Sequence, residues 1–139
     1  MAANNKPIYT AKLYTAFAQT STNYTNLNPA NTSNLTVLGN AAPTTGRIIK
    51  SIVVQAVTNV GDGMARLYRV PSGSTVPRLE TELKIKATTP SSTVPAWSDK
   101  FDLTKFGGQI NLASGDQLYV GTENNLNGLN YFLAGGDLE

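Results

Sequence analysis

The stretch RIIKSIVVQAV, residues 47–57, decides the fold that the sequence predicts. When this stretch is extended, apolar side chains fall on both of its faces: Ile48, Ile52 and Val54 on one, Ile49, Val53 and Val57 on the other. Strands that are covered on both faces carry such near-continuous apolar runs. We therefore expect a central strand here.

Turn sequences and further strand patterns follow this stretch. NVGDG at 59–63 places Asp-Gly in the hairpin position, MARLYRV reads as the next strand, and PSGST at 71–75 is a second turn. Residues 78–87 alternate between apolar and charged side chains, which predicts a strand with one face in water. Its inward residues are expected to be Leu79, Leu83 and Ile85.

The uncharged segment TTPSSTVPAW, residues 88–97, interrupts the strand patterns. Pro90 and Pro95 remove two backbone donors, so the segment is expected to cross between strands near an edge or end of the fold. Trp97, the single tryptophan, then begins the next strand and is expected to seal the core beneath the crossing. A plain connector is the favoured interpretation of the segment, and a subunit contact is the alternative.

Strand patterns continue to both ends of the chain. We expect strands at 8–18, 35–38, 97–103, 108–112, 116–123 and 129–135. In the first of these, Tyr9, Ala11, Leu13 and Phe17 are predicted to share a half-buried face. Many short strands at intervals of about ten residues favour an all-β protein with a single antiparallel, jelly-roll-like β-sandwich. A closed barrel is the alternative.

The first part of the chain differs from the rest. Residues 19–34, QTSTNYTNLNPANTSN, are polar, rich in amides and broken by Pro29. We expect residues 1–34 to form an N-terminal strand and an extended polar arm, part of or appended to the sandwich, and residues 35–139 to form the sandwich domain.

Composition excludes several classes of function. Charged residues make up 14% of the chain, the net charge is +2, and neither cysteine nor histidine occurs. Disulfides, thiolate metal sites and histidine catalysis are therefore impossible. No basic cluster suits nucleic acid, no apolar run approaches the length of a membrane span, and the first residues do not resemble a secretory signal. We expect neither nucleic acid nor membrane as a partner.

No pattern of side chains indicates an enzyme. Glu80 and Glu82 share a strand face, but Lys84 and Lys86 share it too, which is typical of a solvated and charge-balanced surface. Asp99 has the parity of Trp97, Phe101 and Leu103 on the expected inward face, where a bulge, a strand end or a basic partner would have to accommodate it. We expect no catalytic residue and no cofactor.

Two kinds of binding site are weighed against plain structural roles. Asp62, Asp116 and Asp137 fall in expected turns that calcium could use, but their spacing matches no calcium loop, and we expect no metal. Four tyrosines could stack on sugar rings, although half-buried packing is the commoner role of such residues: Tyr14, Tyr24, Tyr68 and Tyr119.

The order of several segments resembles a known group of proteins. RIIKSIVVQAV, GMARLYRV, TPSSTVPAW, INLASGDQLYVGTEN and NYFLAGGDL together look like small β-sandwich virion structural proteins of tailed bacteriophages. The resemblance covers residues 47–138 and leaves the first 46 outside. It implies a non-enzymatic virion component, most simply a capsid decoration or cement protein that binds the major capsid protein lattice and stabilises the head.

The resemblance also implies partners and a location. The protein would assemble in the host cytoplasm and lie on the capsid exterior, as a homo-oligomer for which a trimer is the favoured form. Candidate contacts with other subunits or the capsid are Tyr24, Asn28, Pro29, Asn31, Pro90, Pro95 and Trp97. The alternatives are a receptor-binding or fibre-tip module that recognises a host glycan or protein, and a non-viral carbohydrate-binding module.

Overall fold

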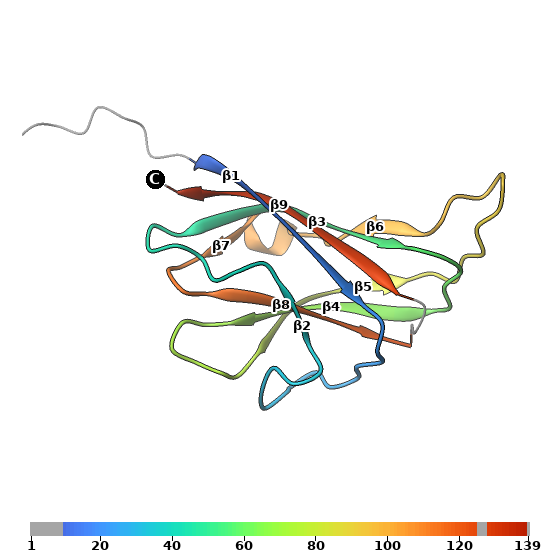
Figure 1. Ribbon diagram of the computed structural model, residues 1–139, viewed down its shortest axis with the longest axis horizontal. Helices are drawn as coiled ribbons and strands as arrows, with labels where there is room; N and C mark the ends of the chain where they lie inside the picture. The colour runs from blue at the N-terminus through green and yellow to red at the C-terminus, as the bar shows by residue number, and fades with distance from the viewer. Residues whose placement is uncertain (1–9, 125–127, 139) are drawn as a thin grey trace, which may run out of the picture.

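The computed structural model describes residues 10–124 and 128–138. They form two antiparallel sheets packed face to face, seen as an upper and a lower layer in Figure 1. The elements are β1 (Thr10–Thr20), β2 (Thr36–Leu38), β3 (Arg47–Ala56), β4 (Gly63–Val70), β5 (Arg78–Ile85), β6 (Ser98–Lys100), the short 3₁₀ helix η1 (Thr104–Phe106), β7 (Ile110–Leu112), β8 (Gln117–Glu123) and β9 (Leu129–Leu138).

The strand order is that of a jelly roll. Sheet A runs β1-β9-β3-β6, and sheet B runs β2-β8-β4-β5. β6 and β7 pair with opposite ends of β3, so together they fill one position in sheet A. Eight strand positions in two interlocked Greek keys define this architecture. The predicted all-β antiparallel sandwich is confirmed, and the chain forms two separate sheets instead of the alternative closed barrel.

The central strand β3 differs from the prediction in its faces. It lies between β9 and the β6/β7 position, as expected. A register shift between Ile49 and Ser51 changes the alternation, so Ile49 joins Ile52 and Val54 in the core. The opposite face is only half-buried, and Val57, just beyond the strand, is 50% exposed. The prediction that both faces are covered was therefore wrong.

The first strand turns the opposite face inward from the one predicted. Tyr14, Ala16 and Ala18 lie toward the core, whereas Leu13 is 91% and Phe17 57% exposed. The side chains of Tyr9 and Ala11, which were predicted to share the inner face, lie outside what the structure describes. β1 pairs with β9 along its length, so the sandwich itself begins before residue 35.

Two connections after β3 have different roles. NVGDG does not close a hairpin, because β3 belongs to sheet A and β4 to sheet B. PSGST does join a hairpin, that of β4 and β5. A register shift opposite Leu67 and Tyr68 leaves Leu79 38% exposed and buries Thr81 in its place, so the predicted inward position of Leu79 was wrong. Ile85 is buried as expected.

The strand predicted at 97–103 is reduced to the three residues of β6. Phe101 and Leu103 are buried, but the Asp99 side chain is exposed and accepts a hydrogen bond from the Lys100 amide. The predicted inward position of Asp99 was wrong, because the extended pairing includes only Ser98–Lys100 before the chain leaves the sheet.

Polar groups join the two sheets inside the core. The hydroxyl of Thr122 on β8 lies 2.6 Å from those of Thr20 on β1 and Tyr131 on β9. All three residues are buried, so each hydroxyl has a partner that replaces water. Burial raises the pKa of Tyr131 to about 12, because the ionised phenolate would lose its hydration.

A second polar cluster links β1 to β3, which lie on either side of β9 in sheet A. Arg47 is 3% exposed, and its Nε donates to Asp137 Oδ1 at 2.6 Å. Its other guanidinium nitrogens donate to the carbonyl and the side-chain oxygen of Asn40, and its central carbon lies 3.4 Å from the centre of the Tyr14 ring. One buried cation thus connects β1, β3, β9 and the β2–β3 loop.

Candidate interaction surfaces

The loop between β1 and β2 folds back over the outer face of sheet B. The Tyr24 amide donates to the Thr122 carbonyl at 2.8 Å, and the Tyr68 hydroxyl donates to the Asn26 carbonyl at 2.8 Å. The Tyr24 ring meets the Tyr68 ring edge to face, with 6.1 Å between centroids. Burial beneath the loop raises the pKa of Tyr68 to about 12. Residues 21–35 are therefore ordered against their own domain.

A glycine allows this close approach. A Cβ atom at Gly121 on β8 would lie 3.0 Å from both the Tyr24 ring and the Leu35 side chain, a distance shorter than ordinary packing. Any larger residue would move the loop away from the sheet. The position of Tyr24 is thus set by a strand about a hundred residues later in the sequence.

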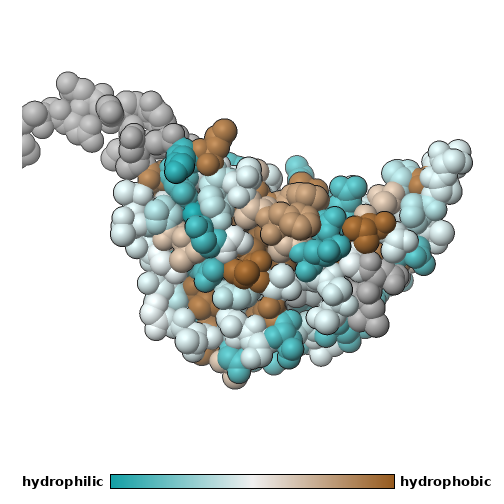
Figure 2. Space-filling model, in the orientation of Figure 1, coloured by the Kyte–Doolittle hydropathy of each residue, from teal (hydrophilic) through white to brown (hydrophobic). Residues whose placement is uncertain are grey.

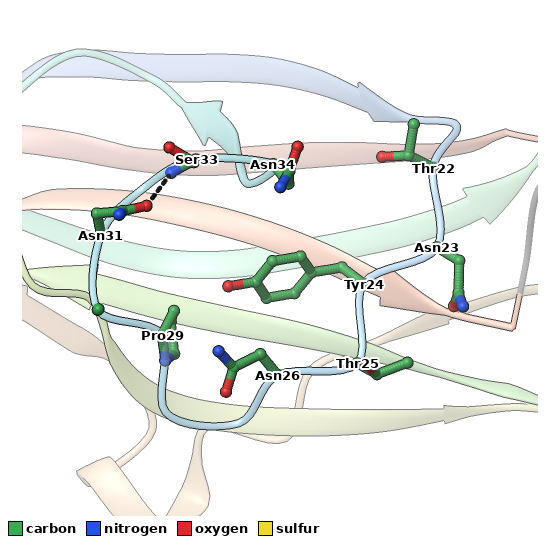
Figure 3. A pocket seen from close by; sticks show the side chains of 10 residues that line it. Thr22, Asn23, Tyr24, Thr25, Asn26, Pro29, Asn31, Ser33 and Asn34 are labelled. Carbon is green, nitrogen blue, oxygen red and sulfur yellow. Dashed lines mark hydrogen bonds between the residues drawn. The ribbon is translucent and has the colours of Figure 1, made fainter.

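The same loop encloses a hollow of ≈550 Å³ (Figure 3). Tyr24, Pro29 and Asn31 line it, so the structure brings three of the candidate contacts together. Asn28 is exposed in the same loop but is not part of the lining. Pro29 itself is buried. Every lining residue is uncharged, and most carry an amide or hydroxyl group.

The other candidate contacts lie on the loop between β5 and β6, which projects from the body of the sandwich in Figure 1. Pro95 is exposed, and Pro90 is half-buried. A turn in which the Ser91 amide donates to the Val94 carbonyl holds the tip. Trp97 is half-buried against the core, and its carbonyl accepts from the Ala56 amide at 2.8 Å. Trp97 therefore anchors the base of this loop.

The two loops leave the same end of the sandwich. β1 and β3 end there, because their last residues, Thr20 and Ala56, both pair with Leu129, the first residue of β9. β5 also ends there, because its last residue, Ile85, pairs with Gly63 at the start of β4. The described residues that line the hollow nevertheless all come from the first loop. The candidate contacts thus lie on two separate loops, one folded over sheet B and one projecting from the end of the sandwich.

Sheet A carries an exposed apolar surface that sequence reasoning missed. Phe17 and Phe132 occupy paired positions on β1 and β9, with ring centroids 5.3 Å apart and exposures of 57% and 42%. Val53 on β3 continues the same row, and Leu13 lies on the same face of β1. Figure 2 shows apolar side chains gathered on the face of the molecule where Figure 1 places β1 and β9. A shallow groove of ≈450 Å³ lies along Phe17, Val53 and Phe132.

This surface could have been found in part from the sequence. In LNYFLAG the buried residues Leu129, Tyr131 and Leu133 alternate, which leaves Phe132 on the opposite face. Phe17 was predicted to point inward, so its pairing with Phe132 on the outer face was not expected. The pairing of the two rings also depends on the β1–β9 register, which the sequence does not reveal.

Two arginines of sheet B form ion pairs with glutamates on neighbouring strands. Arg66 pairs with Glu82 at 3.0 Å and also with Glu123, and Arg69 pairs with Glu80 at 2.7 Å. Glu80 and Glu82 therefore serve two different arginines, instead of facing one another as a carboxylate pair or balancing the lysines of their own strand.

The acids weighed as calcium ligands are engaged separately. Asp62 accepts from the Ala87 amide, Asp116 from the amides of Ser72 and Ala113, and Asp137 pairs with Arg47. Asp137 lies in β9 and not in the predicted turn. Within residues 10–124 and 128–138, no group of three acidic side chains is placed to hold a metal ion. That part of the chain also has no helix long and apolar enough to span a membrane.

Comparison with known proteins gives no relative for this chain: no family model, no curated protein and no solved structure matches it.

Proposed function

We propose that the protein is a structural component of a tailed-phage virion, a capsid decoration protein that binds the major capsid protein lattice and stabilises the head. The observation that carries this proposal is the apolar surface of sheet A, where Phe17 and Phe132 are paired and exposed. Apolar clusters of this kind mark sites of protein association. The jelly-roll order is compatible with the role, because viral capsid domains use it, although a fold alone does not define a function.

The chemistry of the surface suggests how it would bind. The groove along Phe17 and Phe132 can accept an apolar side chain of the capsid subunit. Lys100 pairs with Val53 across β3 and β6, so it extends the row toward a charged end. A capsid surface with an apolar projection and a nearby carboxylate would be complementary. We propose a homotrimer at a symmetry axis of the shell as the bound form.

The test is binding to heads that lack the protein. Purified protein is added to heads built from the major capsid protein of the same phage, and bound protein is measured after sedimentation. Phe17→Ser and Phe132→Ser should each weaken binding by about tenfold or more, as expected for residues at the centre of an interface. Val37→Ser is the matched control, because Val37 is 44% exposed on β2 of the other sheet.

Binding of the two phenylalanine variants at wild-type affinity would contradict the assignment of this surface. Thermal unfolding of each variant separates a lost contact from a lost fold. Because the two residues are 57% and 42% exposed, replacing each should change the free energy of unfolding by only about 1 kcal/mol.

A receptor-binding or fibre-tip module is the second candidate function. The specific observation that favours it is the hollow lined by residues 22–34, which is open to a ligand on the outer side of sheet B. Saturable binding of the isolated protein to host cells, with no binding to heads, would favour this role over decoration.

A further inference from the structure

We propose that the hollow formed by the loop between β1 and β2 binds a neutral saccharide. It lies on the outer side of sheet B, away from the apolar surface of sheet A, and it does not rest on the capsid contact proposed above. The volume of ≈550 Å³ falls within the roughly 300–1,000 Å³ of sites for small ligands. The argument depends on the groups that line the hollow.

The first group is the Tyr24 ring. It is half-buried, supported edge-on by Tyr68, and its hydroxyl end points into the hollow (Figure 3). The hydrogen bonds of Tyr24 and Tyr68 to the backbone hold the ring in place before any ligand arrives. A fixed aromatic ring with a polar tip can pack against the C–H face of a pyranose while its hydroxyl bonds to the sugar.

The second group is a set of side-chain amides whose oxygens are already occupied. Asn26 Oδ1 accepts from the Asn28 amide, and Asn31 Oδ1 accepts from the Ser33 amide, each at 2.9 Å. These short turns leave the NH₂ groups of Asn26 and Asn31 as donors. Figure 3 shows both side chains at the hollow together with Asn34. The backbone of Asn34 is left-handed, with φ 67, which is uncommon outside glycine.

The lining also selects the class of ligand. Among the residues that the structure describes, the lining includes no lysine, arginine, aspartate or glutamate, so these residues offer nothing to neutralise a phosphate, a sulfate or a sialic acid. It is more polar than a site for an apolar molecule would be. Two held NH₂ groups, with hydroxyl groups beside them around one aromatic ring, match the vicinal hydroxyls and the apolar face of a neutral sugar.

The experiment is a titration of the full chain with a panel of neutral sugars, followed by amide chemical shifts. The panel contains glucose, galactose, mannose and N-acetylglucosamine with their short oligomers, and sialyllactose is the charged comparison. At least one neutral sugar should produce saturable shifts centred on residues 22–34. Sialic acid should add nothing to the affinity of the lactose to which it is attached.

Two variants that differ only in position sharpen the test. Asn31→Asp keeps the oxygen that accepts from the Ser33 amide but replaces the NH₂ donor with a charged oxygen. Asn28→Asp makes the same change in the same loop, outside the lining. Asn31→Asp should weaken binding by about tenfold or more, and Asn28→Asp by less than about twofold. Tyr24→Phe should also weaken binding without releasing the loop.

Three results would overturn the proposal: no saturable shifts with any neutral sugar, equal losses for Asn31→Asp and Asn28→Asp, or shifts centred on another surface. The outcome is independent of head binding. Phe17→Ser should weaken the capsid contact and leave sugar binding unchanged, whereas Asn31→Asp should weaken sugar binding and leave the capsid contact unchanged.

Discussion

Replacing Arg47 by methionine tests the internal cluster that fixes β1 against β3. Arg47 is 3% exposed, and it has a partner in Asp137 at 2.6 Å, two acceptors on Asn40 and the Tyr14 ring. Arg47→Met keeps much of the side-chain volume and removes the charge. Removing one member of a buried ion pair costs about 3–5 kcal/mol.

The partners of Arg47 place the expected loss at the lower end of that range. The Asp137 side chain is 21% exposed and Asn40 is exposed, so water can partly replace the lost bonds. The contact with the Tyr14 ring adds about 0.5–1 kcal/mol to the loss. We therefore expect Arg47→Met to lower the free energy of unfolding by about 3 kcal/mol.

Urea unfolding followed by the fluorescence of Trp97, the single tryptophan, measures this loss. Lys50→Met is the matched control, because Lys50 is exposed three residues further along β3 and donates a hydrogen bond to the half-buried Gln109 side chain at 2.6 Å. It should change stability by less than about 0.5 kcal/mol. A loss below about 1 kcal/mol for Arg47→Met would refute the structural role of the cluster.

Three further predictions concern packing and pH. Gly135→Ala would place a Cβ atom against a backbone carbonyl of β3 and should destabilise the protein by about 2–3 kcal/mol in urea unfolding, whereas Gly61→Ala, with open space around it, should be nearly neutral. Trp97→Ala should cost about 2 kcal/mol on thermal unfolding, less than a fully buried aromatic residue, because the ring is half-buried. Burial raises the pKa of Tyr68 and Tyr131 from 10.0 to about 12. Between these pH values the unfolded chain loses the two phenol protons while the folded protein keeps them, so stability should fall as pH rises from about 10 to about 12. Equilibrium unfolding at a series of alkaline pH values checks this, and a flat profile would contradict it.

The features that the sequence predicted correctly depend on residues close together in the chain. The all-β class, the hairpin at PSGST and the burial of Phe101 and Leu103 depend on alternation and turn residues a few positions apart. The N-terminal strand shows the limit of such signals. Tyr14 is inward because its ring packs on Arg47, and this contact forms only after β1, β3 and β9 have come together.

The remaining differences also come from contacts between distant segments. The register shift at Ile49 and Ser51 changes which side chains of β3 enter the core, and nothing in RIIKSIVVQAV marks its position. The loop around Tyr24 was expected to be an arm, but Gly121 and Tyr68 provide a surface on which it folds. Deleting residues 1–34 would remove β1 from sheet A and should unfold the protein, instead of leaving an intact sandwich.

The copy number in purified particles tests the proposed function most directly. Quantitative mass spectrometry of virions made by the phage that we propose as the source of this chain gives the ratio of the protein to the major capsid protein. Decoration of the lattice predicts a fixed ratio, equal to that of a repeated site on the shell. A few copies per particle, as in a fibre or tail tip, or no copies at all, would contradict the proposal.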